Sequence, residues 1–253
     1  MVCLKMKRRP FRRKNKLVMM NDQKTQNDPN LNRAEISSLI KHQAPTPELI
    51  NHYLNLCENC SDVPRTIIEK PDVYQEVYWS SIKNSDKSLT VLISKFPKNN
   101  VLSEIFLKVV AINSLYSTNI FDTYRLAYHI FDIKNFDQRI RNIDSTLVED
   151  IARGHGIKEK RLYSFATKYC SWHNMNYPIY DGYIERLLTK YLRDKKVIFK
   201  SADFRNYDKF IGLIESFRKE YGLTHSIKEI DKFLWLYAKT LDLAEVNNKA
   251  AIK

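Results

Sequence analysis

The feature that most constrains the fold is an apolar pattern of helical period with few residues that would interrupt it. From residue 33 onward, apolar residues recur three and four positions apart, as they do on one face of an α-helix. Only five glycines occur in 253 residues, at positions 154, 156, 182, 212 and 222. The best strand candidate, KVIFK at 196–200, is too short to found a sheet, and the chain contains no internal repeat. The sequence therefore predicts an all-α fold.

Capping residues place several helix boundaries. Thr46, Pro47 and Glu48 form an N-terminal signature, and Pro71 with Asp72 repeats it. The predicted helices are TPELINHYLNLCENC (46–60), KPDVYQEVYWSSI (70–82), NNVLSEIFLKVVAINSLYS (99–117), FDTYRLAYHIFDI (121–133), NFDQRIRNI (135–143), STLVEDIARG (145–154), DFRNYDKFIGLIESFRKEYG (203–222) and SIKEIDKFLWLYAKTL (226–241), after a short helical face at Ile36, Leu39 and Ile40. The strongly apolar helix at 99–117 is expected to be the central buried one.

The charge balance favours a partner that carries phosphate. Lys and Arg number 42 against 29 acidic residues, which gives a net charge of +13. Eight basic residues and no acidic one lie in 1–16, and removing their charges still leaves +5. We expect 1–32 to be a disordered arm, 33–98 to be an N-terminal helical part that is a candidate subdomain, 99–245 to be the core, and 246–253 to be a tail.

The composition also limits the cellular compartments in which we expect to find the protein. No segment reaches the roughly 20 apolar residues of a transmembrane helix, so no membrane partner is expected. No secretory signal is recognisable, and four cysteines do not indicate a disulfide framework. We expect a monomer in the cytoplasm, associated with the nucleoid, or in a nucleus.

The segment 148–188 carries the most chemistry. It contains a helix, a turn with Gly154 and Gly156, a second helix, a loop, and then Asp181 at the start of a third helix. Ser164 is a candidate cap for the second helix, which would put Lys168 in its opening turns. A carboxylate at a helix N-terminus is held ionised by backbone N–H groups and by the helix dipole.

This arrangement resembles the helix-hairpin-helix DNA glycosylases, and most closely their 8-oxoguanine glycosylase branch. The resemblance covers roughly residues 100–195, with YPIYDGYIERLL as its most specific piece. It implies an all-α glycosylase-like domain in which Asp181 and a lysine, Lys168 or otherwise Lys160, form the active site. It also implies DNA contacts by Gly154, Gly156, Lys158, Asn113, Ser117 and Asn119, and a pocket for an extruded base near Trp172, His173 and Tyr180.

The residue types suit that chemistry. Cleavage of an N-glycosidic bond develops positive charge on the sugar, which a fixed carboxylate stabilises. A lysine amine can attack C1′ to form a Schiff base, provided that its pKa is low enough for it to be neutral. The resulting hypothesis is a base-excision glycosylase of double-stranded DNA, with lyase activity if the lysine attacks. The alternative is a DNA-binding or interaction module that keeps the fold without catalysis.

Each of these residues also has a structural interpretation. Asp181 can serve only as a helix cap, and Lys168 only as a solvated helix lysine. Cys57 and Cys60 form one pair of potential zinc ligands, and Cys170 and His173 form another. These pairs are far apart and lack the turn residues of zinc knuckles, so we expect buried or free cysteines, with no metal and no cofactor. P-loop, dinucleotide-binding and His-Glu-x-x-His motifs are absent from the sequence.

Overall fold

The computed structural model describes residues 43–60, 74–154 and 161–251, and within these ranges it contains helices and no strand. The helices are α2 (Pro47–Glu58), α3 (Tyr74–Lys95), α4 (Leu102–Leu115), α5 (Thr123–Asp132), α6 (Phe136–Arg141), α7 (Thr146–Arg153), α8 (Tyr163–His173), α9 (Gly182–Asp194), the 3-10 helix η2 (Ser201–Arg205), α10 (Tyr207–Glu220) and α11 (Ile227–Ala251). The all-α prediction is confirmed for this part of the chain, and KVIFK is a loop. The predicted arm at 1–32, the helical face at 36–40 and the caps Pro71 and Asp72 lie outside it.

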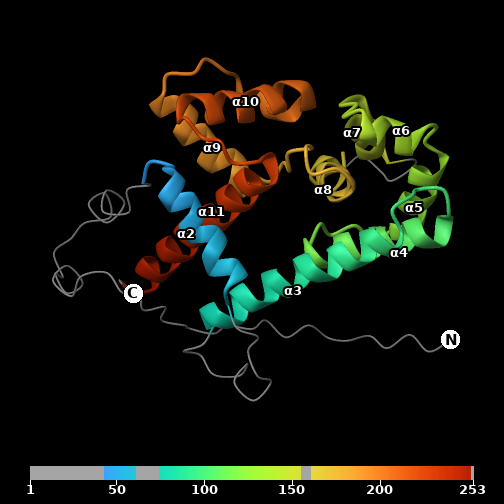
Figure 1. Cartoon of the computed structure of the whole chain (residues 1–253), viewed down its shortest axis with the longest axis horizontal. Helices are drawn as coiled ribbons and strands as arrows, with labels where there is room; N and C mark the ends of the chain where they lie inside the picture. Colours follow the sequence, from blue (N-terminus) through green and yellow to red (C-terminus); the bar gives the residue numbers. More distant parts are fainter. Residues whose placement is uncertain (1–42, 61–73, 155–160, 252–253) are drawn as a thin grey trace.

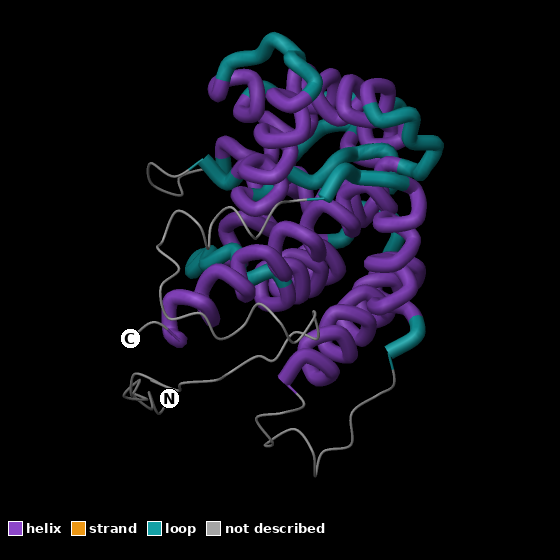
Figure 2. The backbone as a smooth tube through the Cα atoms, turned by 90° about the vertical axis from the view of Figure 1, so that its left-hand side faces the viewer, coloured by secondary structure: helices purple, strands orange, loops and turns teal. Residues whose placement is uncertain are grey.

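Two groups of helices flank α8 (Figure 1). One group comprises α2, α9, α10 and α11, and the other comprises α4 to α7, while α3 runs along one side of both. Figure 2 shows the same packing of helices from the side. Ile50 of α2 and Leu89 of α3 belong to the same hydrophobic core as α8 and α9. The active-site candidates on α8 are therefore surrounded by helices from both halves of the chain.

Local capping explains several boundaries. Thr46 Oγ1 accepts the Leu49 backbone N–H at 3.2 Å, with Pro47 at the first helical position, so the predicted start of α2 is confirmed. Gly222 follows α10 with φ of +61°, the left-handed conformation that glycine adopts without strain.

The central buried helix is α8, and the prediction that 99–117 would fill this role is wrong. Helix α4 leaves Leu107, Val110 and Leu115 exposed by 47%, 39% and 42%. In α8, by contrast, nine of eleven residues are buried, among them Thr167 and Lys168. Apolar residues such as those of α4 can remain exposed at the surface of a folded protein. Polar residues such as those of α8 can be buried when neighbouring groups supply hydrogen bonds.

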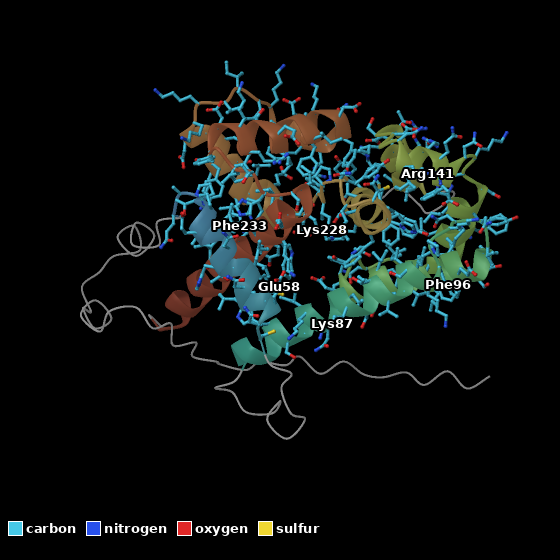
Figure 3. All side chains as sticks on the ribbon, viewed as in Figure 1. Glu58, Lys87, Phe96, Arg141, Lys228 and Phe233 are labelled. Atoms are coloured by element: carbon cyan, nitrogen blue, oxygen red, sulfur yellow. The ribbon has the colours of Figure 1, made fainter. Side chains whose placement is uncertain are left out.

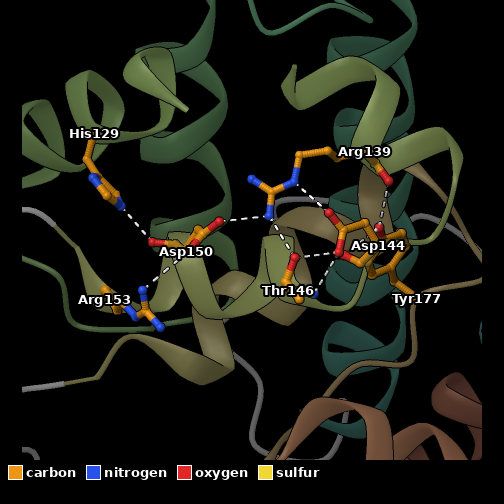
Figure 4. A network of polar contacts seen from close by, with 7 residues as sticks. All are labelled: His129, Arg139, Asp144, Thr146, Asp150, Arg153 and Tyr177. Carbon is orange, nitrogen blue, oxygen red and sulfur yellow. Dashed lines mark hydrogen bonds and ion pairs between the residues drawn. The ribbon is translucent and has the colours of Figure 1, made fainter. Parts of the chain in front are cut away.

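A polar network ties α5, α6 and α7 to the chain that leads into α9 (Figure 4). Arg139 of α6 donates from Nε to Asp144 Oδ2 at 2.6 Å and from Nη2 to Asp150 Oδ2 at 2.7 Å. Tyr177 donates to the main-chain carbonyls of Arg139 and Asp144, both at 3.3 Å. The network holds α7 close to the loop that precedes Asp181.

Two arginines that pair with the same carboxylate test the strength of this network. Arg139 is 21% exposed, whereas Arg153 is 76% exposed and lies 3.6 Å from Asp150. Arg139→Met should lower the free energy of unfolding by about 2 kcal/mol, because two carboxylates lose a shared cation. Arg153→Met should change it by less than about 0.5 kcal/mol. Urea denaturation measures both values, and equal losses would contradict this ranking.

Candidate active site around Lys168 and Asp181

Helices α7 and α8 lie side by side, and α8 carries Lys168 into the core. Helix α7 ends at Arg153, and Gly154 follows with φ of +43°, which favours glycine. The backbone N–H of Leu162 donates to the Ala152 carbonyl at 2.7 Å and fixes the entry of α8. The predicted DNA and catalytic residues Gly156, Lys158 and Lys160 lie outside the described residues.

The loop before α9 is bonded along its length to neighbouring helices. These bonds run from Tyr207 Oη to the Pro178 carbonyl (2.9 Å), from Ile179 N–H to Asp231 Oδ2 (2.8 Å) and from Tyr180 N–H to Thr167 Oγ1 (3.1 Å). Asp181 then caps α9, because its Oδ1 accepts the Tyr183 N–H at 3.0 Å. Helices α8, α10 and α11 thus fix the position of the Asp181 carboxylate, and the capping prediction is confirmed.

Lys168 and Asp181 meet directly. The Lys168 Nζ lies 3.1 Å from Asp181 Oδ2 and donates to Ser164 Oγ at 2.6 Å. The predicted cap at Ser164 is wrong: α8 begins at Tyr163 and its N-cap position is Leu162. The Ser164 hydroxyl, one turn before Lys168 on the same helix, instead accepts a hydrogen bond from its amine.

Burial makes this pair unusual. The Lys168 side chain is 2% exposed, and Asp181 keeps 21%, so the carboxylate is the side of the pair that faces solvent. Burial lowers the pKa of Lys168, and the negative charge of Asp181 partly opposes that change. The arrangement therefore offers an amine with a reduced affinity for its proton beside a fixed carboxylate.

Aromatic rings line the site beside Lys168. Its Nζ lies 5.5 Å from the centre of the Tyr116 ring, and Trp172 Nε1 donates to Tyr116 Oη at 3.0 Å. The Lys228 ammonium of α11 lies 4.2 Å from the centre of the Trp172 ring. Trp172, predicted as a base-pocket residue, is therefore near the pair, but its face carries a cation of the protein.

The other two predicted pocket residues point elsewhere. The Tyr180 ring packs 4.9 Å from Tyr163, under the guanidinium of Arg205, and only its main-chain carbonyl approaches Lys168, at 3.5 Å. His173 stacks on Tyr169 at 4.6 Å and lies in a separate polar cluster around Lys108.

The Lys108 cluster joins α4 and α8 to the segment that follows α3. The fully buried Lys108 ammonium donates to the carbonyls of Phe96 (3.1 Å) and Lys98 (2.8 Å) and to Asn99 Oδ1 (2.8 Å), and it lies 3.3 Å from His173 Nε2. His173 Nδ1 donates to the Tyr169 carbonyl, so Nε2 is the acceptor. Burial lowers the pKa of His173 to about 3 and that of Lys108 to about 8.

The predicted DNA-contact residues of the α4–α5 connection form a turn. Asn113 Oδ1 accepts from Thr118 and from the Ile120 N–H, and its amide donates to the Ile120 carbonyl. Ser117 and Asn119 are exposed and have φ of +49° and +56°. Asn113 thus fixes the turn, and the other two side chains are presented at the surface, close in sequence to Tyr116.

Sequence reasoning missed three residues of the site, Tyr116, Lys228 and Asp231, and it gave Ser164 only as a helix cap. The charged residues of α11 have the spacing of an ordinary solvated face, and no local signal distinguishes Asp231, which is 2% exposed. A buried acid next to Ile230 and Phe233 is recognisable only once α11 is packed against α8 and α9.

The cysteines do not gather with other metal ligands in the described part of the chain. Cys57 and Cys60 lie at the end of α2, while Cys170 is buried in α8, and all three are free thiols. No group of three or more His, Cys, Asp and Glu side chains is close enough to hold a metal ion among the residues described. Within the same ranges, none of the helices combines the length and apolar character needed to cross a membrane.

Comparisons with known proteins match the middle of the chain. The family model HI_0787_N, described as an N-terminal domain, matches residues 65–177. A protein of Haemophilus influenzae named "Uncharacterized protein" is 42% identical over 132 residues, which cover 51% of this chain and 63% of that relative. The match thus spans less than two thirds of the relative. No solved structure matches the chain. The residues matched by the family model include Lys168 and end before Asp181.

Proposed function

We propose that this chain is a DNA base-excision glycosylase of the helix-hairpin-helix type, with Lys168 as nucleophile and Asp181 as the stabilising carboxylate. The observation that supports the proposal most is the 3.1 Å contact between Lys168 Nζ and Asp181 Oδ2 at the mouth of α9. The order of α7 with Gly154 at its end, then α8, a loop and the capping Asp181 is the order that the resemblance to this family implies. The substrate is a damaged or modified base in double-stranded DNA, and the net charge of +13 favours binding to phosphates.

The reaction uses both groups. The lone pair of Lys168 Nζ forms a bond to C1′, and the bond from C1′ to the base nitrogen breaks with its electrons going to the base. The departing base takes up a proton from water. Asp181 stabilises the positive charge that develops on the sugar. The sugar ring opens when the bond from C1′ to O4′ breaks, and O4′ takes a proton from the Lys168 nitrogen. The imine that remains between Nζ and C1′ is reduced by borohydride to a stable protein–DNA adduct.

Trapping as a function of pH tests the role of the amine. Because attack requires a neutral amine, the adduct rate should fall about tenfold per pH unit below the pKa of Lys168. Asp181→Asn removes the negative charge that raises this pKa, so the profile should move to lower pH. A profile that keeps its position in Asp181→Asn would contradict the proposed pair.

A further prediction concerns how much the Asp181 carboxylate accelerates base release. Asp181→Asn should reduce base release by about 100-fold to 1000-fold, because the developing charge on the sugar loses its counterion. The amide oxygen can still accept the Tyr183 N–H, so the cap and the fold should persist. Asp122 is a matched control, since it caps α5 by accepting the Arg125 N–H at 3.1 Å, and Asp122→Asn should retain activity. Equal losses in the two variants would show that capping alone explains the effect.

A second candidate is a DNA-binding or interaction module without catalysis. The observation that favours it is the closure of the site, since Lys168 is 2% exposed and the face of Trp172 is occupied by Lys228. A buried ion pair can also be purely structural. This candidate predicts salt-dependent DNA binding that Asp181→Asn leaves unchanged, with no base release and no adduct from oxidised, deaminated or alkylated duplexes.

A further inference from the structure

A row of exposed aromatic side chains runs along α5. Its members are spaced three, four and three residues apart, the spacing at which a helix presents one stripe to a neighbouring helix. They are Phe121, Tyr124, Tyr128 and Phe131. Phe121, which directly precedes the capping Asp122, is 98% exposed, and the other three are 40% to 56% exposed. We call these four residues the α5 row.

The side chains of the α5 row form a patch that continues onto α4. The centre of the Tyr124 ring lies 5.6 Å from that of Phe106, and Val110, one turn after Phe106, is also exposed. Within the row, the ring centres of Tyr128 and Phe131 lie 6.4 Å apart. The exposed rings are therefore neighbours, not isolated apolar residues of the kind that every protein surface carries.

The patch is large for the surface of a monomer. A full aromatic side chain has about 200 Å² of accessible surface, so the α5 row exposes roughly 500 Å². Apolar patches of this size usually mark binding sites. Two such patches together would bury about 1000 Å², the lower limit for a specific protein–protein interface. Helix α5 lies at the opposite end of the molecule from α2 (Figure 1), in the region where Figure 3 labels Phe96 and Arg141.

The charges along the row do not favour a partner that carries phosphate. The Lys, Arg, Asp and Glu residues within 121–131 are Asp122 and Arg125, and these two pair with each other at 3.1 Å. Binding to phosphate depends on lysines and arginines that can pair with it. A neutral apolar face is also the place where two chains of net charge +13 can approach with the least repulsion. A protein surface therefore fits the row better than a nucleic acid does.

We infer that the α5 row is the contact surface of a homodimer, in which two copies of this chain place their α5 helices antiparallel across a two-fold axis. A two-fold interface needs a surface that is complementary to itself. The row reads Phe, Tyr, Tyr, Phe with the same spacing from either end. An axis midway along it places Tyr124 against Tyr128 of the partner subunit. The same axis places Phe121 against Phe131 of the partner subunit.

This inference replaces the monomer expected from the sequence, and it does not depend on the proposed function. Sedimentation velocity of the full chain over a range of concentrations should show a monomer–dimer equilibrium with a Kd of about 10 µM, as expected for an interface of minimal size. Tyr128→Glu introduces a charge into the row twice per dimer, so it should raise the Kd by at least about 100-fold. Because Tyr128 is half exposed, the fold should persist, which thermal denaturation checks.

Ile198 provides the matched control. Its side chain is 98% exposed, but it lies in the loop that follows α9, outside the α5 row. Ile198→Glu adds the same charge and should leave the Kd unchanged. An equal rise of the Kd in Ile198→Glu and Tyr128→Glu would show that net charge, not the α5 row, controls association, and the inference would fail.

A charge-pairing experiment tests the antiparallel arrangement itself. Tyr124→Lys and Tyr128→Glu should each weaken self-association, whereas a mixture of the two variants should form a heterodimer with a Kd at least about 10-fold lower than either homodimer. The reason is that the new ammonium at position 124 faces the new carboxylate at position 128 of the other chain. A wild-type chain that stays monomeric, a Kd that Tyr128→Glu leaves unchanged, or a mixture that gains no heterodimer would each overturn the inference. A monomeric wild type whose DNA binding is lost in Tyr128→Glu would assign the row to DNA instead.

Discussion

Lys168→Gln is expected to abolish the borohydride-trapped DNA adduct, with a loss of about 1000-fold or more relative to the wild type. The reason is that Lys168 supplies the amine beside Asp181, and a nucleophile that forms a covalent bond has no substitute in an amide. The measurement is a trapping assay on duplexes that carry oxidised, deaminated or alkylated bases, read as protein–DNA adduct on a denaturing gel.

Two other lysines make this experiment specific. Lys160 is the alternative nucleophile predicted from the sequence, and Lys228 is the amine above the Trp172 ring. Lys160→Gln and Lys228→Gln should both still form an adduct. If the adduct survives in Lys168→Gln and disappears in either of the others, the nucleophile has been assigned to the wrong residue. Thermal denaturation and DNA binding of each variant separate a loss of chemistry from a loss of fold.

Lys108→Met is expected to have the largest effect on stability, a loss of about 3 kcal/mol in the free energy of unfolding. Methionine fills a similar volume, but it removes the ammonium that donates to the Phe96 and Lys98 carbonyls. Asn99 Oδ1 also loses this donor and keeps only the Tyr169 hydroxyl, at 2.6 Å. Urea denaturation measures the change, and the fitted slope shows whether unfolding stays two-state.

Lys95 provides the matched control for Lys108. It is exposed at the end of α3, with its ammonium 5.7 Å from the centre of the Phe96 ring. Lys95→Met should change stability by less than about 0.5 kcal/mol. A loss below about 1 kcal/mol in Lys108→Met would mean that water satisfies the two carbonyl oxygens, and the Lys108 cluster would then not be the element that holds α8 in place.

Local features of the fold could be predicted from the sequence because each depends on neighbours within one helical turn. Thr46 and Asp181 cap the helices that follow them, as the residues at those positions indicate. The wrong prediction at Ser164 also concerns a local contact. The Ser164 hydroxyl accepts a hydrogen bond from the Lys168 amine, one helical turn later, in place of capping a backbone N–H. The misplacement of the central helix is different. Apolar content indicates that a helix can be buried, but the contacts of its neighbours decide which faces are covered.

The candidate site also combines features that could be predicted from the sequence with features that depend on tertiary packing. The sequence by itself determined that the chain is helical, that Asp181 starts a helix, and that a lysine-bearing helix precedes it, because these properties follow from short-range sterics and hydrogen bonding. Only the tertiary structure decided that Lys168 is the amine that contacts Asp181, that His173 belongs to the Lys108 cluster, and that Asp231 reaches the loop from α11. The physical reason is that burial and charge pairing depend on how distant helices pack against one another, and no local pattern along the chain encodes that packing.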